Sequence, residues 1–165
     1  MLKYSVLILM VVSQIVMAEE QVSYLNKAKK VGENVWIGPQ PTAQDFDELA
    51  AEEIGAVVNT RTAAEMEQLG YSEVEQASKF NMTYDLLEIG TGHPYSPAKL
   101  ETFNALMTAN KDKKMVLHCR SGHRASQLYA AWLIKHQNKS TSEALEAIGS
   151  NETELNDAMK SLLGQ

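Results

Sequence analysis

One short stretch of the chain, 118–126, combines the residue types that nucleophilic chemistry on an anion requires. It contains Cys119, the only cysteine of the sequence, and Arg124. An apolar run, 115–117, precedes it and an alanine-rich segment follows, an order that predicts a strand, a tight loop and a helix. The N–H groups of such a loop and of the helix N-terminus converge on one point, where they bind an oxyanion or stabilise a thiolate.

The residues that follow Cys119 suit that chemistry. The positive helix end, Arg120 and Arg124 favour a thiolate over a thiol. Gly122 lets the backbone approach a bound anion without a Cβ, and Arg124 presents a planar fork that can hold two oxygens. A lone cysteine at the end of a buried strand is more often an inert small hydrophobe, but the polar neighbours disfavour that interpretation. The candidate substrate-binding residues are Arg120, Ser121, Gly122 and His123.

The loop resembles the active-site loops of two cysteine-dependent families. Tyrosine and dual-specificity phosphatases have His-Cys, then five residues, then Arg, whereas rhodanese-like sulfurtransferases often have Cys-Arg-Ser-Gly-x-Arg. Four residues separate Cys119 from Arg124, so the length and the residue sequence of the loop match the rhodanese form. The histidine that directly precedes the cysteine, His118, instead matches the His-Cys pair of the phosphatases.

The chain upstream of the loop resembles a phosphatase-like family related to the dual-specificity phosphatases. That family is named for a domain fused to beta-lactamase-hydrolase-like enzymes. The matching sequence motifs are IGPQP at 37–41, IGAVVNTR at 54–61, and Glu65. The resemblance extends over about 35–136. It implies an α/β, cysteine-phosphatase-like fold and a protein-tyrosine-phosphatase-like hydrolase.

The resemblance to phosphatases implies a mechanism. Cys119 would attack phosphorus and form a phosphocysteine, while the loop N–H groups and Arg124 stabilise the equatorial oxygens. A carboxylic acid should protonate the leaving oxygen, and phosphatases carry an Asp for this step on the loop before the cysteine strand. The corresponding loop here, 88–97, contains no Asp. The candidates for the acid are, in order of preference, Glu88, Asp85 and His93.

Two further residues are supporting candidates, His118 and Arg61. In the phosphatases the histidine before the cysteine lies behind the thiolate and favours its charged form, and a buried core histidine is the equally weighted alternative. Arg61 follows an apolar strand, at the edge where open α/β sheets hold their ligands. Arg61 and Glu65 either line the cleft or pair with each other across a helix turn.

The loop is also compatible with two other functions. In a rhodanese-like sulfurtransferase Cys119 would carry a persulfide, no general acid would be needed, and the shorter loop would form a bowl better sized for one sulfur atom. A non-enzymatic module would bind phosphate or sulfate in the same loop, although it has no need of a thiolate. The expected partners are a phosphorylated small molecule or protein, or a sulfur donor, and no cofactor is expected.

Alternating strands and helices must position this loop. Strands are predicted at 34–38, 56–60, 82–87 and 115–117, and helices at 42–53, 73–80, 98–109, 125–137, 140–149 and 151–163. Residues 21–30 read as an ordered lead-in. The alternation predicts a single α/β domain with a central, mostly parallel sheet flanked by helices.

The N-terminus and the composition bound the remaining possibilities. The N-terminus has the features of a secretory signal peptide at 1–18: Lys3, a short apolar run and Ala18. The phosphatase-like domain is then expected at 19–165. A periplasmic location is predicted, with no stable membrane insertion after signal removal. The chain has 15 basic and 21 acidic residues and a net charge of −6, which disfavours nucleic-acid binding. Its four histidines are too scattered to predict a metal site.

Overall fold

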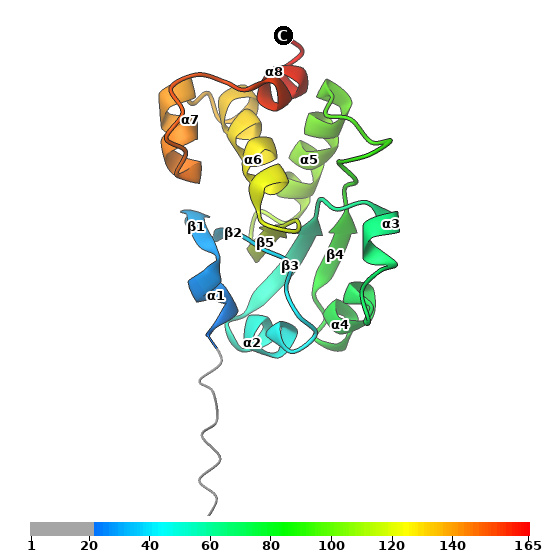
Figure 1. Ribbon diagram of the computed structural model, residues 1–165. Coiled ribbons are helices and arrows are strands. Elements are labelled where there is room, and N and C mark those ends of the chain that lie inside the picture. Colours follow the sequence, from blue (N-terminus) through cyan, green and yellow to red (C-terminus); the bar gives the residue numbers. More distant parts are fainter. Residues whose placement is uncertain (1–21) are drawn as a thin grey trace, which may run out of the picture.

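A five-stranded sheet forms the centre of the computed structural model, which describes residues 22–165 (Figure 1). The strand order is β1-β2-β5-β3-β4, and only β1 runs antiparallel to its neighbour. The strands are β1 (Lys29–Gly32), β2 (Val35–Gly38), β3 (Ile54–Asn59), β4 (Thr83–Leu86) and β5 (Lys114–His118). The expected α/β fold with a central, mostly parallel sheet is confirmed.

Helices cover both faces of this sheet, and the two groups lie at the top and the bottom of Figure 1. The group on one face is α5 (Pro97–Ala109), α6 (His123–His136), α7 (Thr141–Ile148) and α8 (Asp157–Leu163). The group on the other face is α1 (Tyr24–Lys27), α2 (Asp45–Ala51) and α4 (Glu73–Lys79), while the short α3 (Ala63–Met66) follows β3. Each crossover helix therefore returns the chain to the same edge of the sheet before the next parallel strand begins.

The side chains of β5 alternate between the two cores. Met115 and Leu117 enter the larger apolar cluster under α5 and α6, whereas Val116 enters the smaller cluster formed with α1, α2 and α4. Successive strand residues point to opposite faces, so His118 lies on the same side as Val116. The last residue of the central strand, directly before Cys119, therefore lies on the face of the sheet that carries the smaller cluster.

Several boundaries differ from the sequence-based expectation. The predicted helix at 42–53 begins only at Asp45, because Thr42 and Asp45 form a reciprocal backbone–side-chain pair one turn earlier. The last helix does not begin at Asn151; the side chain of Asn156 accepts a hydrogen bond from the Met159 N–H at 3.1 Å and starts α8 there. The lead-in contains α1 and the edge strand β1.

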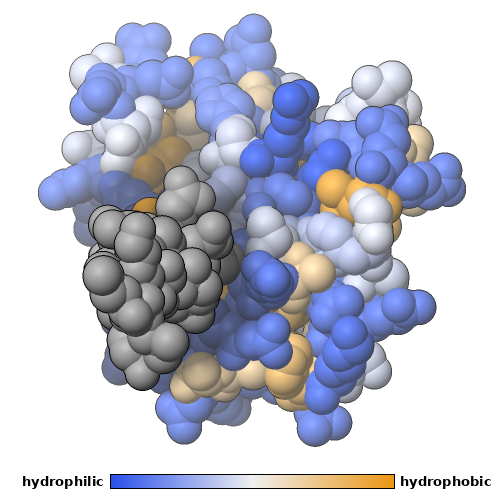
Figure 2. Space-filling view, turned by 60° about the horizontal axis from the view of Figure 1, so that its bottom comes forward, coloured by the Kyte–Doolittle hydropathy of each residue, from blue (hydrophilic) through white to orange (hydrophobic). Residues whose placement is uncertain are grey.

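The face shown in Figure 2 is mainly hydrophilic, with scattered apolar side chains. The exposed large apolar residues among those described are Val22, Val74 and Leu86. Within residues 22–165, no helix combines the length and the apolar character needed to cross a bilayer. The predicted signal peptide lies outside the described residues.

Candidate active site

The thiol of Cys119 lies inside the loop that joins β5 to α6. Cys119 directly follows the central strand and is 1% exposed, and the Gly122 N–H donates a hydrogen bond to its Sγ at 3.1 Å. β5 is flanked by β2 and β3, both parallel to it, so the loop stands at the carboxyl edge of the sheet. This is the edge at which open α/β sheets bind their ligands.

Gly122 is required by the shape of this loop. It is the N-cap of α6 and has a φ of 90°, which side chains rarely tolerate. A Cβ at this position would also lie 3.2 Å from the carbonyl oxygen of Gly38. With Gly122 as the cap, α6 begins at His123, two residues before the predicted start at Ala125. The N–H groups of the first turn have no partner within their own helix and give this end a partial positive charge.

Arg124 is fixed from outside the loop by Glu65, which belongs to α3. Its Nη1 and Nη2 atoms donate to the two carboxylate oxygens of Glu65, each at 2.7 Å. These hydrogen bonds hold the pKa of Glu65 at about 2, against an ordinary value of 4.5, and raise the pKa of Arg124. Nη1 also donates to the carbonyl of Ile89 at 2.5 Å. These contacts use three of the five N–H groups of Arg124. The N–H of Nε and the second N–H of Nη2 remain for an oxyanion.

Arg61 contacts the same carboxylate. Its Nε lies 3.5 Å from Oε1 of Glu65, and its Nη1 donates to Oε1 of Gln40 at 2.7 Å. The side chain is buried. Arg61 and Glu65 therefore do pair across one helix turn, as one of the two sequence-based alternatives has it. Through Glu65, Arg61 is also connected to Arg124.

A second buried carboxylate, Glu73, lies beside His118. The two side chains are 1% or less exposed, and Nε2 of His118 lies 3.3 Å from Oε2 of Glu73, without the alignment of a hydrogen bond. Oε2 accepts hydrogen bonds from Asn59 at 2.9 Å and from the Tyr84 hydroxyl at 2.8 Å, and Oε1 accepts one from Gln40. Burial would raise the pKa of Glu73, but the nearby His118 and these hydrogen bonds bring it below its ordinary value.

Gln40 connects the two carboxylates. Its amide nitrogen donates to Glu73 and its amide oxygen accepts from Arg61. A continuous set of polar contacts therefore runs from His118, which precedes Cys119, to Arg124 at the other end of the loop. Sequence reasoning did not identify Glu73, because its place in a short polar helix carries no functional signal. Gln40 belongs to the IGPQP motif at 37–41, and that motif was the only signal in the sequence that could have identified it as a site residue.

The acid candidate Glu88 contacts the beginning of α3. Its Oε2 accepts a hydrogen bond from the Ala63 N–H at 2.7 Å and lies 3.4 Å from Nε2 of His93, so the first and third candidates are neighbours. The next residue along the chain, Ile89, contacts Arg124 through its carbonyl. The second candidate, Asp85, is a half-buried residue within β4.

The rim of the loop is formed by Arg120, Ser121 and His123, all exposed. His123 lies 3.0 Å from the amide nitrogen of Gln127, and the Tyr95 hydroxyl donates to the Gln127 amide oxygen at 2.5 Å. Burial raises the pKa of Tyr95. Tyr95 and Gln127 were not predicted as site residues, and only the packing of the 88–97 loop against α6 brings them to the rim.

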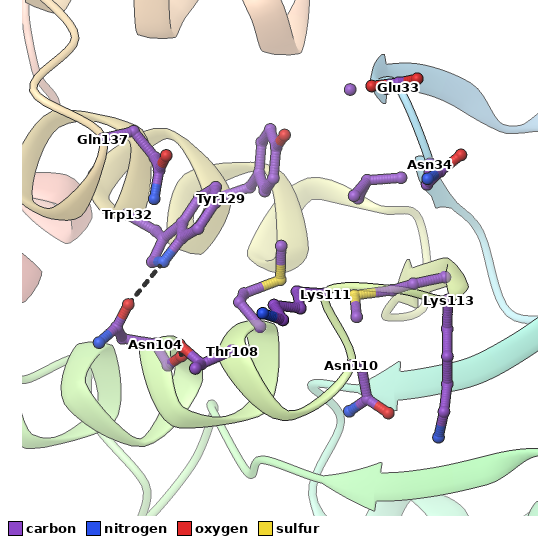
Figure 3. Close-up of a pocket in the computed structure, with 14 residues that line it drawn as sticks. Glu33, Asn34, Asn104, Thr108, Asn110, Lys111, Lys113, Tyr129, Trp132 and Gln137 are labelled. Atoms are coloured by element: carbon purple, nitrogen blue, oxygen red, sulfur yellow. Dashed lines mark hydrogen bonds between the residues drawn. The ribbon is translucent and has the colours of Figure 1, made fainter.

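A polar pocket of about 540 Å³ lies at the opposite edge of the sheet (Figure 3). It is lined by Asn34 and Met115, which lie at the starts of β2 and β5, and by Trp132, whose indole N–H donates to Asn104. Because Cys119 follows the other end of β5, this pocket is separate from the candidate active site.

Comparisons with known proteins agree with this geometry. A family model described as "DSP-PTPase phosphatase fused to NAD+ Kinase" matches residues 10–162. A search of curated proteins finds no match. The active form of Tk-PTP has a similar structure, with a TM-score of 0.68, 22% identity, and coverage of 84% of this chain and 97% of that one. PTPMT1 in complex with PI(5)P has a TM-score of 0.68, 20% identity, and coverage of 83% and 92%.

Proposed function

This chain belongs to the family of DSP-PTPase phosphatases fused to NAD+ kinase, and we propose from that premise that it hydrolyses phosphate monoesters through a phosphocysteine on Cys119. It is a protein-tyrosine-phosphatase-like enzyme by family, and its solved structural relatives have the same fold. The observation that carries the mechanism is the hydrogen bond from the Gly122 N–H to the sulfur, in a loop that Arg124 closes.

The proposed reaction uses the loop in two ways. The Cys119 thiolate attacks the phosphorus atom, and the phosphoryl group moves from the ester oxygen to sulfur. During transfer the charge on the three equatorial oxygens is stabilised by the loop N–H groups and by the free N–H groups of Arg124. Because Glu65 already fixes the guanidinium, little reorganisation is needed when the phosphate binds. Water then hydrolyses the phosphocysteine.

The proposed general acid is Glu88, with His93 beside it. Oε2 of Glu88 lies 3.4 Å from Nε2 of His93, and the hydrogen bond from Arg124 to the Ile89 carbonyl brings their loop next to the reactive loop. Glu88 must leave the Ala63 N–H to reach a leaving group, so its action would require a rearrangement of the 88–97 loop.

The findings favour phosphoryl transfer over the two alternatives. The matched family and the named structural relatives are phosphatases, and none of these findings points to a sulfur donor. The four-residue spacing between Cys119 and Arg124 was the strongest argument for sulfur transfer, and it is a property of the loop alone. Proposed substrates are phosphorylated small molecules or proteins; one structural neighbour, PTPMT1, has been crystallised in complex with PI(5)P.

We also propose export to the periplasm, on the basis of the signal-like sequence at 1–18. N-terminal sequencing of the protein recovered from a periplasmic fraction would test it. A mature chain that begins at Glu19 is expected. Recovery of chains that retain Met1 in the cytoplasmic fraction would contradict export.

The function itself is tested by a paired assay of the purified protein and its Cys119→Ser variant. One arm follows phosphate release from an aryl phosphate, and the other follows transfer of sulfur from thiosulfate to cyanide. We expect Cys119-dependent phosphate release. Sulfur transfer without phosphate release would mean that the shorter loop determines the chemistry, and binding without turnover would point to the non-enzymatic module.

A further inference from the structure

A pocket of about 320 Å³ adjoins the rim of the Cys119 loop. Four parts of the chain form it: the loop with the start of α6, the α1–β1 segment, the end of β2 with Pro39, and the end of α7. Its polar lining side chains are Lys27, Lys29, Ser121, His123 and Ser126. Residues Ser121 to His123 belong both to the candidate active site and to the wall of this pocket, so a molecule held in the loop could extend directly into it.

The pocket is lined by groups that suit an anion. Among residues 22–165 no carboxylate lines it, although acidic residues outnumber basic ones in the whole chain. Its two ammonium groups, two hydroxyls and one imidazole can all donate hydrogen bonds to phosphate oxygens. The walls also include the apolar side chains of Val31, Ile37 and Ile148.

The edge strand β1 places one of these lysines by its alternation. Lys29 pairs with Ile37 of β2, and both line the pocket. Lys30 pairs with Trp36 on the opposite face, and its Nζ lies 5.0 Å from the centre of the Trp36 ring. Only one of two adjacent lysines is therefore directed to the active-site side.

The two lining lysines differ in their present contacts. Lys27 lies 3.7 Å from the buried carboxylate of Asp45, a long ion pair that leaves its other donors free. No salt bridge of the described residues involves Lys29, whose Nζ lies over Gly149 at the carboxyl end of α7. A cation at a helix carboxyl end is favourable by itself. Lys29 can keep that position and still donate into the pocket.

We propose that this pocket binds a second phosphate group of the substrate, so that the enzyme prefers small organic phosphates that carry two phosphate groups. The inference rests on the proposed function, because it assigns the reacting phosphate to the Cys119 loop. The first phosphate occupies the loop N–H groups and Arg124, and the second contacts Lys29, Lys27 and the rim donors.

Calorimetric binding to the full-length Cys119→Ser variant tests the proposal without depending on turnover. The probes are inorganic orthophosphate, which can fill only one position, and inorganic tripolyphosphate, which can extend from one position to the next. We expect tripolyphosphate to bind about tenfold more tightly or better, since each charge-assisted hydrogen bond adds roughly that factor. Lys29→Gln should reduce this ratio severalfold, and Lys27→Gln serves as a second variant.

Lys30→Gln is the matched control, because it removes the same charge from the neighbouring position on the opposite face of β1. The ratio of the two affinities should be unchanged in Lys30→Gln. Equal losses in Lys29→Gln and Lys30→Gln, or tripolyphosphate that binds no better than orthophosphate, would overturn the proposal. If the wild-type protein fails to hydrolyse an aryl phosphate while the ratio and its dependence on Lys29 persist, the hydrolytic function fails and the second anion site stands.

Discussion

Arg124 and Glu65 form a two-point ion pair in which each carboxylate oxygen accepts a hydrogen bond of 2.7 Å. The pair uses one N–H of Nη1 and one of Nη2. The N–H of Nε and the second N–H of Nη2, on the side edge of the guanidinium, remain for a bound oxyanion. Glu65 therefore determines the orientation in which Arg124 can meet the phosphate. The sequence separation of 59 residues makes this a property of the tertiary structure.

Replacement of Glu65 by Gln should lower activity more than stability. The amide cannot accept two hydrogen bonds from Arg124, so the guanidinium loses its fixed orientation, and we expect kcat/KM for an aryl phosphate to fall about 10- to 100-fold. A partly exposed ion pair contributes less than a buried one, so unfolding should become easier by only about 1–2 kcal/mol. Steady-state kinetics and urea unfolding measure the two effects. Glu67→Gln, an exposed change just after α3, should leave both unchanged, and equal kinetics for the two variants would contradict the positioning role.

The pH dependence of stability should carry the signature of Glu65. Its pKa is about 2 in the folded protein and about 4.5 in the unfolded chain, so the unfolded state binds more protons between these values. The contribution of Glu65 to stability is complete above pH 4.5 and is lost as the pH falls towards 2. Urea unfolding at a series of pH values should show this decline, and Glu65→Gln should make it shallower. If the stability of Glu65→Gln declines at low pH as steeply as that of the wild type, other carboxylates cause the decline.

The Glu73→Gln variant tests the buried contact with His118. Buried Glu73 accepts hydrogen bonds from Gln40, Asn59 and Tyr84, and a Gln amide cannot accept all of them, so we expect a loss of about 1–3 kcal/mol of stability. The substitution also removes the carboxylate oxygen that lies 3.3 Å from Nε2 of His118, the residue directly before Cys119. The alkylation rate of Cys119 should therefore differ from that of the wild type. Glu75→Gln changes an exposed residue of the same helix and should alter neither quantity. An unshifted alkylation profile in Glu73→Gln would limit Glu73 to a structural role.

The Glu88→Gln variant tests the proposed general acid through the leaving group. A missing proton donor matters most when the departing oxygen is strongly basic, so we expect alkyl phosphates to lose about 100-fold in kcat and aryl phosphates with acidic phenols to lose little. A series of aryl phosphates of graded phenol pKa measures this slope. Equal losses across the series would exclude Glu88 as the acid. The corresponding series for His93→Gln would separate the contribution of its neighbour.

A methyl group at Gly122 should disturb the loop. The φ of 90° and the 3.2 Å approach to the Gly38 carbonyl predict that Gly122→Ala costs about 1–3 kcal/mol of stability and weakens phosphate binding. Thermal unfolding and the inhibition constant of orthophosphate measure these effects. Gly70→Ala is the control, since no neighbouring atom lies within 4 Å of a Cβ there. A fully active and stable Gly122→Ala protein would contradict the strain argument.

Local patterns in the sequence were sufficient for the strand, loop and helix that carry Cys119. Strand-like segments of three to six residues marked the parallel strands, and the helix predicted at 98–109 corresponds to α5 (Pro97–Ala109). Helix starts were less predictable where capping depended on tertiary contacts. Gly122 caps α6 through a left-handed φ and a close approach to Gly38, which no local propensity reveals.

The sequence by itself therefore determined the α/β fold, the reactive loop and the family, because these depend on periodicity and on residues adjacent in the chain. Tertiary structure alone decided which side chains meet at that loop. Glu65 reaches Arg124, and Glu73 reaches His118, only because the order of the strands places the ends of β3 and β5 side by side. Side-chain pairing over such separations depends on strand order and on the packing of the crossover helices, and a linear pattern contains neither.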